Sequence, residues 1–218
     1  MARFAVCKRP LVAACCLLVA TALARAQVIE PDRGGEGTTE FALFLATANL
    51  DVGEAEVDFL FGRAEGDLEG TIAGVGVSKS ISSSWTGRIA YFGYFQEDIE
   101  RPDPQDDRLR VESTWSGEVL GRPVSQRLRV ERRFRDVEDE TRFRPETTID
   151  LPAIGPAAPY VSVEPFLSDQ DGFEQVLLEA GATLPIGERL ALRPAYAYGI
   201  GSGQPDTSLF LVLLQLKR

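Results

Sequence analysis

Apolar and polar residues alternate along most of this chain, in segments separated by clusters of Gly, Pro, Asp and Ser. Alternation with a period of two is typical of β-strands, and the separators are residues that supply turn dihedrals. After residue 26 we find no 3.6-residue apolar period over three turns, so we expect almost no helix there. The pattern predicts eleven strands, at about residues 38–50, 53–63, 68–80, 84–96, 106–118, 123–136, 140–151, 158–168, 173–185, 188–200 and 206–217.

The predicted strands are long and have two chemically different faces. Strands of soluble proteins average about 5–6 residues, whereas a strand that crosses a bilayer needs about 9–11. In "GEAEVDFLFGR", Phe59 and Phe61 share one face and Glu56 and Asp58 share the other. Long strands that are apolar on one side and charged on the other indicate a sheet with lipid outside and polar groups inside.

A sheet with an apolar outer face must close on itself in lipid, because an open edge would leave backbone groups without partners. The sequence therefore predicts an all-β fold, an antiparallel up-and-down transmembrane β-barrel over residues 38–218. Bacterial single-chain barrels have an even strand number. We expect twelve strands, with a short first strand supplied by "QVIEPDRG" within residues 27–37. Ten strands is the fallback, if one predicted segment is not a strand.

The first 26 residues have the layout of a secretory signal peptide. Arg3, Lys8 and Arg9 precede an apolar run, and Ala24-Arg25-Ala26 gives the small-x-small pattern of a cleavage site, at Ala24 and Ala26. We expect export through the Sec pathway, handling by the barrel assembly machinery, and a final location in the outer membrane of a double-membraned bacterium.

Composition then excludes several kinds of chemistry. Removal of residues 1–26 takes away four of the 23 basic residues and none of the 33 acidic ones, so the net charge becomes −14. That charge excludes a general nucleic-acid binder. The chain has no histidine, and its three cysteines, Cys7, Cys15 and Cys16, precede the cleavage site. Histidine-dependent catalysis, disulfides and the usual zinc sites are therefore excluded, and we predict no enzyme, no cofactor and no metal site.

The unit "RLRVE" occurs at Arg108–Glu112 and again at Arg127–Glu131, and "RFRPE" follows at Arg142–Glu146. If the Leu and Val residues face outward, the Arg and Glu residues face the barrel interior. We therefore predict an interior charge ladder on four neighbouring strands. Its members are Arg108, Arg110, Glu112, Arg127, Arg129, Glu131, Arg133, Arg142, Arg144, Glu146 and Glu164.

Two registers of the first hairpin, whose turn lies near "VLGR", keep these faces. One pairs Arg108 with Glu131 and Glu112 with Arg127. The other pairs Arg110 with Glu131 and Glu112 with Arg129. Each cross-strand pair of opposite charges contributes about 0.2–1 kcal/mol in water.

In the next hairpin we expect Arg129 to face Glu146 and Glu131 to face Arg144. Pro145, Pro165 and Pro194 each remove a ladder donor, and we expect them at bulges or strand ends.

The order of these segments resembles an outer-membrane β-barrel family classed as a domain of unknown function. The resemblance covers about residues 38–217. An apolar hairpin comes first and a final strand comes last, and between them lie "GVGVSKSISSSWTGRIAYFGYFQ", "DRLRVESTW", "QRLRVERRFRD", "RFRPETTI", "PYVSVEPF" and "FEQVLLEAGATLPIGERLALRPAYAYG". It implies an outer-membrane barrel of unassigned activity and supplies no catalytic residue.

We expect an integral outer-membrane barrel with a structural role or a narrow passage, with outer-membrane lipid as its surroundings. Whether a small solute passes is left open. The alternative is a soluble periplasmic β-barrel or β-sandwich that binds a ligand, and a membrane enzyme is a third class.

Overall fold

A computed structural model of the chain describes residues 38–52, 54–66, 70–96, 105–135, 138–201 and 206–216. The chain divides into two compact units, Met1–Glu30 and Pro31–Arg218, and the second contains every described residue. No helix in the described ranges is long and apolar enough to cross a membrane. The strands are β1 (Thr38–Val52), β2 (Ala55–Gly66), β3 (Gly70–Ser80), β4 (Trp85–Gln96), β5 (Gln105–Val119), β6 (Arg122–Arg135), β7 (Glu140–Asp150), β8 (Ala158–Ser168), β9 (Gly172–Ile186), β10 (Leu190–Gly201) and β11 (Asp206–Leu216).

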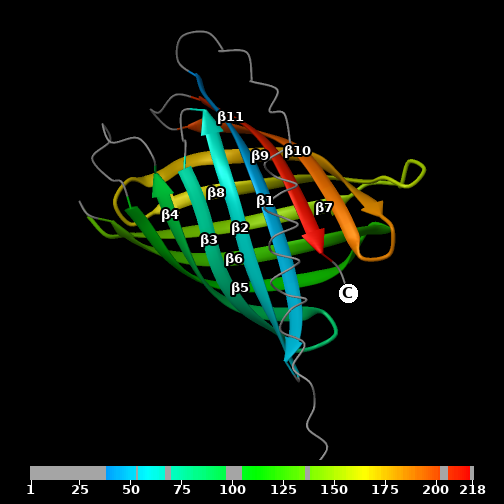
Figure 1. The fold of residues 1–218 in the computed structure, drawn as a ribbon. Coiled ribbons are helices and arrows are strands. Elements are labelled where there is room, and N and C mark those ends of the chain that lie inside the picture. The colour runs from blue at the N-terminus through cyan, green and yellow to red at the C-terminus, as the bar shows by residue number, and fades with distance from the viewer. Residues whose placement is uncertain are drawn as a thin grey trace, which may run out of the picture. The chain divides into compact units, whose positions relative to one another are not determined.

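The eleven strands form one closed barrel in which each strand pairs with its neighbours in sequence (Figure 1). The all-β barrel is thus confirmed, but the expected twelve strands and the fallback of ten are both wrong for the described residues. With an odd number, β1 and β11 meet in parallel, and eleven residues of each are in register. A parallel ladder also supplies partners to the backbone groups, so closure does not require an even count. The segment "QVIEPDRG" lies outside the described residues.

Alternation along the strands places small or charged side chains inside and large apolar ones outside. Leu109 and Val111 on β5 are exposed, as are Leu128 and Val130 on β6, while Glu112 and Glu131 are buried. Phe59 and Phe61 on β2 are also exposed, as the sequence pattern predicts. The strands of 11 to 15 residues extend about 36–50 Å along their own direction.

The connections between strands fall at two ends of the barrel. We call one end the turn rim; its connections are residues 53–54, 81–84, 120–121, 151–157 and 187–189. The other end is the loop rim, with connections 67–69, 97–104, 136–139, 169–171 and 202–205. The β5–β6 turn consists of Leu120 and Gly121, both with positive φ (52° and 74°), which is the geometry of a type I′ hairpin.

Pro145, Pro165 and Pro194 interrupt ladders within strands rather than marking strand ends. Pairing of β7 with β8 stops after Phe143–Leu167 and resumes at Thr147–Val163, so Pro145 and Pro165 stand opposite each other in the gap. Pro165 also lies close to a bulge between Phe166 and Leu167. Pro145 and Pro194 have no bulge beside them. For these two the expectation of a bulge or a strand end is wrong, because the loss of a donor leaves a local gap without changing the register.

Candidate functional site

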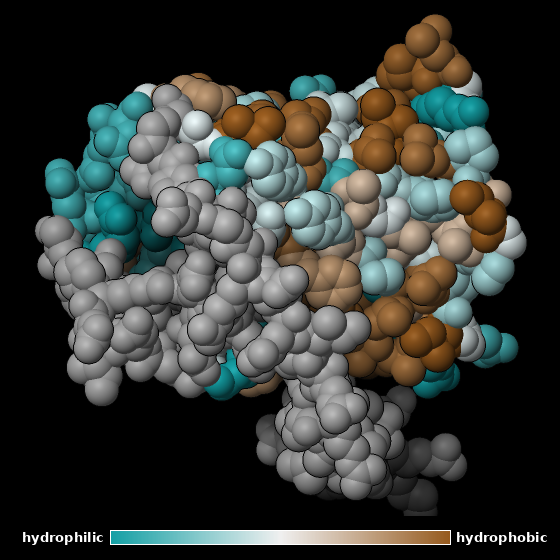
Figure 2. Space-filling view, turned by 90° about the horizontal axis from the view of Figure 1, so that it is seen from above, coloured by the Kyte–Doolittle hydropathy of each residue, from teal (hydrophilic) through white to brown (hydrophobic). Residues whose placement is uncertain are grey.

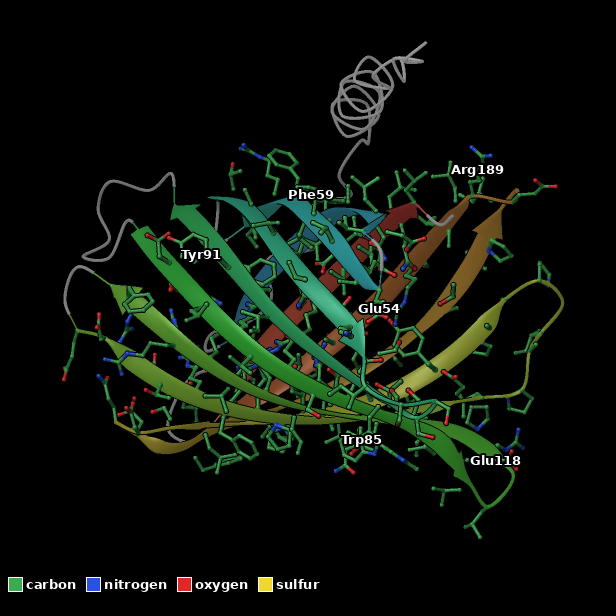
Figure 3. The ribbon with its side chains drawn as sticks, turned by 90° about the horizontal axis from the view of Figure 1, so that it is seen from below. Glu54, Phe59, Trp85, Tyr91, Glu118 and Arg189 are labelled. Carbon is green, nitrogen blue, oxygen red and sulfur yellow. The ribbon has the colours of Figure 1, made fainter. Side chains whose placement is uncertain are left out.

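The sequence-predicted charge ladder lies on the interior face of β5, β6, β7 and β8. Side chains with nitrogen and oxygen atoms occupy the space enclosed by the sheet (Figure 3). β5 and β6 pair in the second of the two predicted registers, with Arg110 opposite Glu131 and Glu112 opposite Arg129. The Nε of Arg129 donates to Oε1 of Glu112 at 2.7 Å, and the Nε of Arg110 donates to Oε2 of Glu131. The two-residue turn at Leu120-Gly121 selects this register, because loop length fixes which residues face each other.

Between β6 and β7 the predicted pairing is wrong by two residues. Arg127 faces Glu146, Glu131 faces Arg142, and Arg129 faces Arg144. A shift of two keeps every side chain on its face, so the hydrophobic pattern cannot distinguish the two registers. The consequence is that two arginines stand directly opposite each other.

Glu164 on β8 compensates that arrangement. Its carboxylate lies 3.0 Å from Nη2 of Arg144, 3.3 Å from Nη2 of Arg127 and 3.7 Å from Nη1 of Arg129. One buried carboxylate therefore binds three guanidinium groups from β6 and β7. Glu131 contributes from the other side, with Oε2 3.8 Å from Nη1 of Arg144.

The network extends beyond the predicted ladder toward β2. Arg88 on β4 lies 3.0 Å from Glu112 and 2.5 Å from Asp58 of β2, and so bridges across β3. Gly76 on β3 makes the bridge possible. A Cβ at position 76 would lie 2.6 Å from Oδ1 of Asp58 and 2.7 Å from Nη2 of Arg88.

Toward the loop rim the network continues through two further carboxylates. Asp106 accepts hydrogen bonds from Arg108 and Arg133. Glu140 lies 3.0 Å from Arg133 and 2.8 Å from Arg142. Arg142 in turn lies 2.8 Å from Glu174 on β9.

These ion pairs join into one continuous cluster on seven strands, which we call the interior network. It contains nine arginines and eight carboxylates, so its charge is close to balanced. The members are Asp58, Arg88, Asp106, Arg108, Arg110, Glu112, Arg127, Arg129, Glu131, Arg133, Arg135, Glu140, Arg142, Arg144, Glu146, Glu164 and Glu174.

Every residue of the predicted ladder belongs to this network, and six members were missed by sequence reasoning: Asp58, Arg88, Asp106, Arg135, Glu140 and Glu174. Period-two alternation along "AEVDFLF" and "WTGRIAYF" would have placed Asp58 and Arg88 on the inner face, but their contact depends on β3 having no side chain at Gly76.

Two aromatic rings support the guanidinium groups. The guanidinium carbon of Arg110 lies 4.2 Å from the centre of the Phe92 ring, and that of Arg144 lies 3.9 Å from the centre of the Phe166 ring. Both rings are buried. Stacking on an aromatic face favours a desolvated cation, so Phe92 and Phe166 stabilise the arginines where water is scarce.

A separate interior contact lies nearer the turn rim. The guanidinium of Arg193 on β10 stacks on Tyr160 of β8 at 4.6 Å, and the Tyr160 hydroxyl donates to Glu179 of β9 at 2.6 Å. Gly181 leaves room for the phenol, since a Cβ there would lie 2.6 Å from its oxygen. This contact ties three neighbouring strands together outside the network.

Within the network, each carboxylate lies against at least one guanidinium. The arrangement is therefore suited to cross-linking strands and filling the interior. Among the described residues, no group of three or more His, Cys, Asp or Glu side chains is placed to hold a metal ion.

Residues 53–208 match the family described as "Protein of unknown function (DUF2490)". No curated protein and no solved structure matches the chain. The family match spans β2 to the first residues of β11, and so covers the whole interior network. The chain therefore belongs to the DUF2490 family of proteins of unknown function.

Proposed function

We propose that the protein is an integral outer-membrane β-barrel whose lumen is closed by the interior network. It acts as a structural, non-conducting barrel and not as an open pore or an enzyme. The observation that carries the proposal is the distribution of side chains in the described barrel: large apolar residues lie outside and charged residues inside, the reverse of a soluble protein.

The exposure of individual side chains shows this reversed distribution. Thirty large hydrophobic residues of the described strands and turns are exposed, whereas Asp106, Glu112, Arg129, Glu131, Glu140 and Glu164 are buried. Among the described residues, only four buried hydrophobic residues are larger than alanine. A barrel with this distribution would leave a wide apolar surface in water, which soluble proteins rarely do. Lipid around the barrel would cover that surface (Figure 2).

The closed lumen is supported by the strand number and by the network. About eight strands leave an interior that side chains just fill, and about 16–18 leave a channel. With eleven strands the lumen is only slightly wider than the filled case. The network lines the inner wall from Asp58 on β2 to Glu174 on β9, and Glu131 is fully inaccessible to solvent.

Two measurements test the membrane part of the proposal. After carbonate extraction, the protein should stay in the membrane pellet of expressing cells. The purified protein should migrate differently in gels before and after heating, as folded barrels do. Recovery in the carbonate supernatant would favour a soluble periplasmic binding barrel and contradict the proposal.

Bilayer recording tests the closed lumen. The unmodified protein should show no steady conductance in planar bilayers. A variant in which Glu112, Glu131 and Glu146 are all replaced by Gln loses three counter-ions, and we expect it to be less stable or to conduct. Steady conductance by the unmodified protein would identify a passage, and an unchanged triple variant would show that the network is not what closes the lumen.

A further inference from the structure

The turn rim carries an exposed aliphatic side chain in, or directly beside, each of its five connections. The exposed fractions are 61 % for Val52, 71 % for Ile81, 99 % for Leu120, 74 % for Ile154 and 50 % for Ile186. We call these five residues the aliphatic rim. They are spread around the whole circumference, because their connections join β1 to β2, β3 to β4, β5 to β6, β7 to β8 and β9 to β10.

Leu120 is the least expected of the five. It occupies the first position of a type I′ turn with φ at 52°, a conformation in which Asn, Asp or Gly is ordinarily found. A leucine there strains the backbone, and its side chain is almost wholly exposed. Neither property helps the hairpin to form, so an apolar group at this tip indicates a contact outside the chain.

The backbone at two other tips is held in place by hydrogen bonds. The Ile81 amide donates to the Trp85 carbonyl at 2.8 Å. Ile154 and Ala157 exchange backbone hydrogen bonds at 2.9 and 3.1 Å. These tips are therefore fixed turns that present their side chains outward.

The opposite end of the barrel has the reverse chemistry. Among the residues of the loop-rim connections that the structure describes, Glu138, Asp139, Asp169 and Asp171 are acidic and exposed, and none is basic. Figure 2 shows hydrophobic residues gathered toward the right, where the β7–β8 and β9–β10 connections lie in Figure 1. The turn rim is thus suited to contact with an apolar surrounding, and the loop rim to contact with water.

We infer that the aliphatic rim is immersed in the interfacial region of a phospholipid leaflet, so that the barrel sits in the membrane with its turn rim inside the lipid layer. This inference rests on the proposed membrane location. Lipid is favoured over a protein partner because the five side chains form a ring around the rim, whereas a protein would cover one side. The rim is also continuous with the apolar outer face, through Val119 and Trp85.

The same rim also carries exposed charged groups of both signs, the acidic ones including Glu118, Asp150 and Glu188. Arg122 and Arg189 are exposed beside the β5–β6 and β9–β10 tips, and Figure 3 shows Arg189 and Glu118 toward the same end. Arginine side chains can place an apolar stem in lipid and a guanidinium at the phosphate level. Lys79 is paired with Glu54 at 2.8 Å, which removes one acidic charge from the lipid contact.

Site-specific fluorescence tests the inference. Cys7, Cys15 and Cys16 are replaced by Ala, and single cysteines are introduced as Leu120→Cys, Ile154→Cys and Gln170→Cys. Gln170 is exposed at the loop rim and serves as the matched control. Each variant is labelled with a polarity-sensitive fluorophore and placed in phosphatidylcholine–phosphatidylglycerol vesicles that contain nitroxide lipids labelled near the headgroup.

We expect about twofold quenching at positions 120 and 154 and little at position 170. Equal, weak quenching at all three positions, in protein that still resists carbonate extraction, would overturn the lipid contact and leave the membrane barrel standing. Protection of position 120 from aqueous iodide without lipid quenching would point to a protein partner and would also overturn the inference. Release of the protein from the vesicles by carbonate would contradict both the membrane location of the barrel and the lipid contact of the aliphatic rim.

Discussion

Arg129 on β6 stands directly opposite Arg144 on β7, and the carboxylate of Glu164 lies against both guanidinium groups. Like charges that face each other across two strands destabilise a sheet. This pair is held because Glu112 neutralises Arg129 from β5 and Glu131 approaches Arg144. The network is therefore cooperative, since the position of each arginine depends on carboxylates from more than one strand.

Replacing Glu164 by Gln should destabilise the barrel by about 3 kcal/mol, because three buried or half-buried arginines lose their shared counter-ion. Urea unfolding in detergent, followed by the fluorescence of Trp85 and Trp115, measures the change. Glu118→Gln removes an exposed carboxylate at the end of β5 and is the control, with an expected change below about 0.5 kcal/mol. Equal midpoints for the two variants would show that Glu164 is not a structural counter-ion.

An arginine on the outer face should affect stability in a depth-dependent way if lipid surrounds the barrel. Val111 lies in the middle of β5 and Val119 at its end, and both are exposed. We expect Val111→Arg to cost about 2–4 kcal/mol and Val119→Arg about 0–1 kcal/mol in vesicles. Unfolding titrations in vesicles give both values, and a similar small cost for the two would argue that the outer face is in water.

Gly74 on β3 should not tolerate alanine. A Cβ at position 74 would collide with the ring of Phe92 and lie 2.7 Å from the carbonyl oxygen of Tyr91. Because a carbonyl cannot rotate away as a side chain can, we expect a loss of about 1–3 kcal/mol. Gly87→Ala is the control, since its Cβ would meet only the flexible end of Ile81 at 3.2 Å. Thermal or urea unfolding that shows no difference between the two variants would contradict the packing of β3 against β4.

Leu120→Asn should stabilise the barrel in detergent micelles by about 1 kcal/mol, because asparagine tolerates the left-handed conformation of this turn. Val119→Asn is the control: it introduces the same polar side chain at the neighbouring strand position, and it should not raise the stability of the barrel. Urea midpoints in micelles compare the two. A lower midpoint for Leu120→Asn would mean that the turn does not have the described geometry.

A pH effect is expected at the loop rim. The Thr141 amide donates to Oδ1 of Asp169 at 2.9 Å, and this hydrogen bond lowers the pKa of the Asp169 carboxyl. A lowered folded-state pKa contributes stability above the ordinary carboxyl pKa, and the contribution is lost as pH falls through the lowered value. The amide resonance of Thr141 should titrate at that low pH and become pH-independent in Asp169→Asn. Titration of Thr141 at or above the ordinary carboxyl pKa would contradict the contact.

The sequence alone predicted which side chains face the barrel interior and which face outward. Alternation predicted that Phe59, Leu109 and Val111 face outward, and it placed Glu112 and Glu131 inside, because a period of two leaves no other choice on a long strand. It also predicted the β5–β6 register as one of two, since the turn near Leu120-Gly121 limits the pairing.

Register and closure needed information from strands that are distant in sequence. The β6–β7 register puts Arg129 opposite Arg144. When only β6 and β7 are considered, this pair of like charges looks unfavourable, because the carboxylate that compensates it, Glu164, lies on a third strand, β8. The reach of Arg88 to Asp58 depends on the missing side chain at Gly76. The strand count failed because the even-number rule describes a tendency of known barrels, and the backbone chemistry also permits a parallel closure.

The parallel contact of β1 with β11 has a consequence for how the barrel can assemble and be re-engineered. Thr38 pairs with Asp206, so this seam joins residues far apart in sequence, and such non-local pairings are slow to form. Thr38 and Leu216 also lie at opposite rims of the barrel. A circular permutant that connects them would need a linker of about ten residues or more to span the wall, whereas an even-stranded barrel could use a two-residue turn.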